Sequence, residues 1–178
     1  MLQVPGASQG KGLMALPTSF DMSFAPTTQL VSVVRRFVMS LYERILEDDQ
    51  MSSQLGLATH ELLENAVKYN VDAETMLRVT LTPRTESLSE ICVTIRTRNR
   101  ATPENIRIAE RLITKVREAE DPFMFYQQLI QASADESSGS GLGLARIRAE
   151  TEMTIDFKVE GDEIEIVAQA SVRPGGEP

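Results

Sequence analysis

The order of helical and extended patterns predicts an α/β fold: a two-layer sandwich with a mixed, mostly antiparallel sheet and helices on one face. Apolar residues at three- and four-residue spacing predict several long helices. Alternating apolar and polar residues predict four strands, near residues 77–82, 91–96, 155–159 and 164–168. Such clean alternation is typical of strands that bury one face only. Strands and helices do not alternate regularly, so a parallel βαβ sheet is not expected.

The first seventy residues of the chain predict one strand and two helices. A short strand is expected at residues 18–24, and Thr27 or Thr28 then caps a long helix that ends at residues 47–50. This helix carries one continuous apolar stripe, made of Leu30, Val33, Val34, Phe37, Leu41 and Ile45. A second helix is expected from about residue 52 to residue 69.

The rest of the chain predicts two strands, three helices and a closing hairpin. Pro103 suits the first turn of a helix whose inner face holds Ile106, Ala109, Ile113 and Val116. A short helix follows at residues 123–132, and its aromatic cluster fits core or lid packing, or alternatively a docking surface. A polar stretch leads into a helix at residues 142–150, and Gly161-Asp162 turns the final hairpin.

The length predicts one domain, at residues 18–171, between flexible tails at 1–17 and 172–178 that are rich in glycine and proline. The 18 basic and 26 acidic residues give a net charge of −8, which argues against broad nucleic-acid binding. Single Cys and His residues exclude a disulfide scaffold and a two-histidine metal motif. No signal-peptide core or membrane span is visible, so a cytoplasmic location is expected.

The segment from His60 to Tyr69 carries the first chemical pattern. Glu61 and Asn65 are four residues apart and so share one side of a helix, with Lys68 three residues further on. A carboxylate can orient or deprotonate a water, an amide oxygen can coordinate Mg²⁺, and a lysine can meet a phosphate. The alternative is a solvated helix face with i, i+4 pairs.

The second pattern is GSGLGL at residues 139–144, directly before a predicted helix. Glycine allows the backbone to approach an anion closely, and the helix start offers free N–H groups and a positive dipole end. Phosphate binding is therefore the physical expectation. The alternative is a flexible Gly/Ser linker.

Together the two segments resemble the GHKL ATPases with the Bergerat fold, a family that includes sensor histidine kinase ATP domains, type II topoisomerases, heat-shock 90 chaperones and MutL proteins. Residues 61–69 look like the N-box and residues 139–144 like the second glycine box. The layout is most similar to the bacterial anti-sigma factor serine kinases, with a long helix that carries Arg35-Arg36 before the N-box. The resemblance covers about residues 18–170.

The resemblance implies ATP and Mg²⁺ as cofactors and a role for each matching residue. Glu61 would be the general base or the carboxylate that orients water, Asn65 would hold Mg²⁺, and Lys68 would approach a phosphate. The residues of the glycine box would wrap the triphosphate, with Leu144 packed behind it: Gly139, Gly141, Leu142, Gly143 and Leu144.

One segment departs from the family. Where the family has an Asp-x-Gly-x-Gly box that binds adenine, this chain reads NRATP at residues 99–103. Asn99 keeps a carbonyl oxygen that could accept from adenine, but it lacks the charge. Ala101 is small enough to replace a glycine where φ stays negative, and Pro103 removes an N–H. The altered box puts nucleotide binding, and turnover still more, in question.

Two functions follow from these observations. The first is an ATP-dependent serine protein kinase that acts in signalling by partner switching, which Glu61 and Asn65 favour. The second is a degenerate ATPase-like module that sequesters a regulatory protein without catalysis, which the altered box favours. In both cases the expected partner is a regulatory protein, such as a sigma factor or an antagonist, and the resemblance also implies a homodimer. No nucleic acid or membrane is expected.

Overall fold

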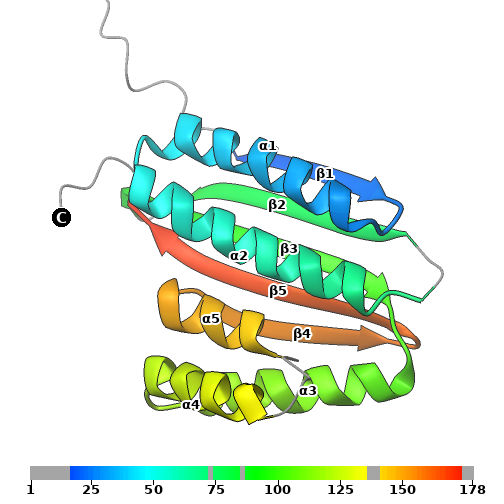
Figure 1. The fold of residues 1–178 in the computed structure, drawn as a ribbon. Coiled ribbons are helices and arrows are strands. Elements are labelled where there is room, and N and C mark those ends of the chain that lie inside the picture. The colour runs from blue at the N-terminus through cyan, green and yellow to red at the C-terminus, as the bar shows by residue number, and fades with distance from the viewer. Residues whose placement is uncertain (1–16, 72–73, 85–86, 136–140, 174–178) are drawn as a thin grey trace, which may run out of the picture.

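The computed structural model describes residues 17–71, 74–84, 87–135 and 141–173 of the chain (Figure 1). The elements, in order, are β1 (Thr18–Phe24), α1 (Thr28–Leu46), α2 (Asp49–Lys68), β2 (Thr75–Arg84), β3 (Ser87–Arg100), α3 (Pro103–Glu118), α4 (Pro122–Asp135), α5 (Leu142–Glu150), β4 (Thr154–Glu160) and β5 (Glu163–Val172). The predicted tails at 1–17 and 172–178 fall almost wholly outside the described residues, and β5 includes Val172.

The sheet has the strand order β1-β2-β3-β5-β4. Each neighbouring pair of these described strands is antiparallel. Helices α1 and α2 cross one face of the sheet, and α5 lies beside α2 over β4 (Figure 1). The predicted two-layer α/β sandwich is therefore confirmed, and its sheet is more regular than the mixed arrangement that the sequence suggested.

Alternation along β3 decides which side chains reach the helical layer. Ile91, Val93 and Ile95 are buried under the helices, and the same alternation brings Asn99 to the inner face at the end of the strand. Asn99 pairs with Ile164 of β5. A polar side chain is thereby placed at the floor of the space between the sheet and the helices.

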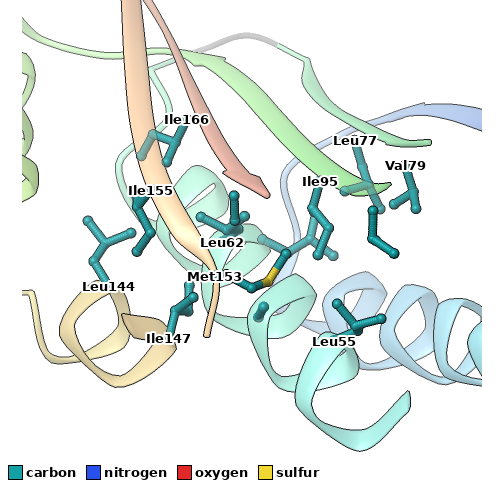
Figure 2. Packing of buried hydrophobic residues seen from close by; sticks show 14 of the residues in the cluster. Leu55, Leu62, Leu77, Val79, Ile95, Leu144, Ile147, Met153, Ile155 and Ile166 are labelled. Atoms are coloured by element: carbon teal, nitrogen blue, oxygen red, sulfur yellow. The ribbon is translucent and has the colours of Figure 1, made fainter. Parts of the chain in front are cut away.

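The core lies between the sheet and helices α1, α2 and α5. Figure 2 shows Leu62 of α2 and Ile147 of α5 pointing toward Ile155 and Ile166 of the sheet. Leu62 and Ile147 have no exposed surface, and each buried side chain of this size contributes about 1.5–3 kcal/mol. This packing ties α2 and α5, which are far apart in the sequence, to the same strands.

Helix α1 buries a different face from the stripe that the sequence suggested. Its buried residues are Val31, Val34, Val38, Tyr42 and Leu46. Leu30, Val33 and Phe37 of the predicted stripe are 37–51% exposed, and Phe37 packs edge-to-face on Phe20 of β1. Valine and tyrosine at a second four-residue spacing compete with the stripe, and the position of α2 settles which face turns inward.

The turn between α1 and α2 is shorter than expected. Glu47 takes a left-handed conformation with φ 53° and ends α1, and Asp48 caps α2 through its side chain, which accepts from the N–H of Met51 at 2.8 Å. Helix α2 therefore begins at Asp49, three residues before the predicted start. Asp48 of the acidic run therefore serves as a helix cap, a role that was not predicted from the sequence.

Among the helices of the described residues, none has both the length and the hydropathy that a bilayer crossing requires.

Candidate functional site

Helices α2 and α5 meet at the predicted N-box. Glu61 and Asn65 lie one turn apart on α2 and face the start of α5. A Cβ atom added at Gly143 would lie 2.4 Å from Oε2 of Glu61 and 3.5 Å from Nδ2 of Asn65. Glycine at this position lets the N-box side chains pack directly over the backbone of α5. The two predicted boxes are thus in contact, although about 80 residues separate them in the sequence.

The amide nitrogen of Asn65, Nδ2, is buried and makes no hydrogen bond to any described residue. Burial of an unpaired polar group costs about 1–3 kcal/mol, so such groups usually have a partner in the working protein. The nitrogen and oxygen of an asparagine amide exchange places by a half-turn, and the side chain can therefore offer either atom to a ligand.

Glu61 forms an ion pair with Arg146 of α5. Oε1 of Glu61 accepts from Nη1 of Arg146 at 3.2 Å, and the Glu61 side chain is only 13% exposed. Nε of Arg146 also donates to Glu150 at 2.9 Å. The Glu150 hydrogen bond, with the charges of Glu150 and Glu61, raises the pKa of Arg146 above its usual value. Arg146 is not among the site residues predicted from the sequence.

The described part of the glycine box forms the N-terminus of α5. Gly141 is the N-cap with φ 103°, a conformation that side chains rarely adopt, and it makes no side-chain cap. The first helical bond runs from the N–H of Ala145 to the carbonyl of Gly141, so the three preceding amides have no acceptor within the helix. Leu144 is buried behind them, and Leu142 is partly buried. Gly139 lies outside the described residues.

The junction between β3 and α3 holds the altered box. Asn99 is 5% exposed, and its Nδ2 donates to the carbonyl of Arg100 at 3.0 Å. The N–H of Ala101 donates to the carbonyl of Asp162 in the β4–β5 turn at 2.9 Å. Thr102 caps α3, with Pro103 at its first position. These bonds fix a junction that contains no glycine.

These segments line one pocket with about 560 Å³ of empty space, including its open mouth. Its predicted residues are Asn65, Asn99, Ala101, Gly141 and Leu144. The further lining residues are Tyr69, Asn105, Ile108, Ala109, Leu112, Ile164 and Ile166.

The spacing of several pocket-lining residues on α3 indicates, already in the sequence, that they share one face of the helix. Asn105, Ala109 and Leu112 follow one another at helical intervals, which places them on a single face of α3. The inner face predicted from the sequence, at residues 106, 109, 113 and 116, shares only Ala109 with this face. The pocket wall on α3 was therefore not predicted.

Lys68 is not among the residues that line this pocket. It is exposed, with Nζ 5.1 Å from the centre of the Tyr69 ring, a cation–π distance. The described residues that line the pocket are uncharged: three asparagines, one tyrosine, two alanines, one glycine and five larger aliphatic residues. Within the described residues, the pocket can therefore recognise a ring by amides and apolar contacts.

A magnesium site here would depend mainly on the ligand. No group of three or more His, Cys, Asp or Glu side chains in the described ranges could hold a metal ion. Asn65 could supply one amide oxygen, and Mg²⁺ usually completes its octahedron with phosphate oxygens and water. The Asn65 side chain, whose Nδ2 atom has no partner among the described residues, fits that role when a half-turn of its amide brings the oxygen to the ion.

Comparison with known proteins identifies a fold neighbour. A chain of the SiaB–SiaC complex from Pseudomonas aeruginosa is similar in fold, with a TM-score of 0.59 and 12% sequence identity. The similarity covers 86% of this chain and 89% of that chain. No protein-family model and no curated protein sequence matches the chain. At this identity, the likeness concerns the arrangement of helices and strands.

Proposed function

We propose that this protein is a signalling regulator that binds ATP with Mg²⁺ in the pocket between α2, α3 and α5, and that it acts on a protein partner. One observation carries the proposal. The two segments that resemble GHKL boxes, around Asn65 and Gly141, line a single pocket together with Asn99 of the altered box. Unrelated surface motifs, or a flexible linker at the glycines, would have no reason to meet in this way.

The proposed placement of the nucleotide follows from the lining. The apolar end, with Asn99 and Ala101, would take the base, and Asn99 would offer its carbonyl oxygen because its nitrogen is bonded to Arg100. The free amides at the start of α5 would face the phosphates, which a helix N-terminus favours. Asn65 would hold Mg²⁺ between the two ends.

The proposed partner is a regulatory protein. The neighbour in fold was solved as a complex of two proteins, which supports an interaction role. The net charge of −8 favours a partner with a basic surface. A sigma factor or an anti-anti-sigma-like antagonist in the cytoplasm, controlled by partner switching, agrees with the resemblance to the anti-sigma factor kinases.

The enzymatic form of this proposal is an ATP-dependent serine protein kinase. In it, Glu61 would act as the general base and Lys68 would approach a phosphate. A second form is a degenerate module that binds its partner without turnover. The ion pair between Glu61 and Arg146 and the position of Lys68 outside the pocket favour the second form.

Isothermal calorimetry with MgATP tests the binding site. The wild type should bind, and Asn65→Ala should weaken magnesium-dependent binding by about tenfold, because a ligand to a charged ion is lost. Glu64→Ala is a matched control, since Glu64 neighbours Asn65 on the exposed side of α2. No heat at millimolar ATP would exclude a nucleotide site, and unchanged binding by Asn65→Ala would remove the magnesium assignment.

Transfer of labelled γ-phosphate separates the two forms. If purified candidate partners gain phosphate on serine in the presence of this protein, the kinase form holds. If they bind in a nucleotide-dependent way and gain no phosphate, the binding module holds.

A further inference from the structure

The Glu61 carboxylate lies against two residues of α5. Oε1 meets the guanidinium of Arg146 at 3.2 Å. Oε2 lies over the backbone of Gly143, where an added Cβ would come within 2.4 Å. Gly143 and Arg146 are three residues apart and so share one face of α5. One carboxylate oxygen is therefore paired with α5, and the other lies against its backbone.

This position differs from that of a free general base. A base needs an oxygen within hydrogen-bond reach of the proton that it takes. To reach a substrate, the Glu61 carboxylate would have to leave Arg146 and move out of a largely buried position, since its side chain is only 13% exposed. Removal of a charge partner from a largely buried carboxylate is costly.

Arg146 is itself held in place before any ligand arrives. Its Nε atom is bonded to Glu150, one turn further along α5, while its Nη1 atom reaches across to α2. Two carboxylates thus orient one guanidinium. The pair with Glu61 also cancels a negative charge beside Asn65, where an unpaired carboxylate would repel an approaching phosphate.

We propose that Arg146 is a positioning residue that fixes Glu61 as a charged link between α2 and α5, so that Glu61 is a structural counter-ion and not the general base. This inference deepens the proposed function, and only its nucleotide readout rests on that function. The link holds the N-box asparagine and the N-terminus of α5 at a set separation. It also sets a positive charge against the Glu61 carboxylate beside Asn65.

A double-mutant cycle on stability tests the link without any ligand. Glu61→Gln, Arg146→Met and the double variant are unfolded in urea, and the unfolding constants are compared. The two changes should couple by about fivefold or more, and Arg146→Met should be the more harmful single change because it leaves a buried charge unpaired. The exposed pair Arg117–Asp156 gives the matched control cycle, with an expected coupling of about twofold or less.

Equal coupling in the two cycles would overturn the proposal. So would an Arg146→Met protein that is as stable as the wild type. This cycle decides the proposal even if the wild type binds no ATP, a result that would defeat the proposed function instead.

The affinity for MgATP gives a second test, because a simple loss of packing would not produce the pattern expected here. Arg146→Met should weaken binding by about five- to tenfold, and adding Glu61→Gln should restore most of it, because the unpaired charge is removed. Failure of that rescue would contradict the proposal. A Glu61→Gln protein that binds ATP normally but loses phosphate transfer would also overturn it, because that result identifies a base.

Discussion

The two ends of the pocket bring neighbouring segments into close contact in different ways. At the α2–α5 wall, two helices approach so closely that Gly143 touches Glu61, and Gly141 turns the chain with φ 103°. At the β3–α3 junction, where the resemblance leads one to expect glycines, Ala101 and Pro103 stand instead. That junction is fixed by hydrogen bonds to the β4–β5 turn and by a helix cap.

The difference shows where glycine is needed. A side chain is strained at a φ as large as that of Gly141, and it is excluded where another group occupies the place of its Cβ, as at Gly143. Neither holds at Ala101, which is buried and bonded to Asp162 with no positive φ. The wall therefore depends on glycine, and the junction depends on its asparagine and its cap.

The largest effect is expected from Gly141→Ala, which should lower the free energy of unfolding by about 3 kcal/mol. The new Cβ would be strained at this φ and would lie 2.5 Å from Cδ2 of Leu112. Gly161→Ala is the control, because Gly161 has φ 65° with no atom within 4 Å of the added Cβ, and it should cost about 1–2 kcal/mol. Urea unfolding measures both. Equal losses of stability in the two variants would show that Leu112 moves aside freely and that α3 packs loosely against the start of α5.

At the junction, Asn99→Asp should cost about 2 kcal/mol at neutral pH. A carboxylate oxygen would replace the Nδ2 atom that donates to the carbonyl of Arg100, in a position that is 5% exposed. Burial raises the pKa of the introduced carboxyl, so the loss should shrink as the pH falls and the protonated group donates again.

The control for this change is Asn105→Asp, which should alter stability by less than about 0.5 kcal/mol. Asn105 also lines the pocket, but it lies in the first turn of α3, where the helix dipole favours a negative charge. Similar losses in the two variants would mean that the bond to Arg100 does not hold the junction together.

The smallest effect is expected from Asp162→Asn. The hydrogen bond from Arg100 lowers the pKa of the Asp162 carboxyl below its usual value. A lowered pKa in the folded state stabilises the protein above the unfolded-state pKa, and this contribution is lost as the pH falls through the folded-state pKa. Both side chains are half exposed, so the difference between variant and wild type should be slight, should disappear in acid and should shrink with added salt. A large loss at neutral pH would show that this pair, and not the backbone bond to Ala101, anchors the junction.

Much of the architecture could be predicted from periodicity. The inner residues of α2, such as Leu55 and Leu62, and the alternation of β3 and β5 are placed as their spacing indicates, because burial of one face follows directly from the helical and extended periods. The inner face of α1 could not be predicted in this way. Its apolar residues surround too much of the helix, and packing against α2 selects Val31 and Val38 over Val33 and Phe37.

For the site, spacing alone places Glu61 and Asn65 on one side of a helix and GSGLGL at the start of another. The packing of distant segments decides the rest. It brings the two segments into contact, sets the position of Gly143 and forms the pocket walls from α3 and β5. The ion pair between Glu61 and Arg146 shows the limit most clearly. Residues 85 positions apart meet only because α2 and α5 cover the same strands, and no local pattern carries that information. The sequence by itself determined which groups are present, and the tertiary structure decided which of them are engaged with each other.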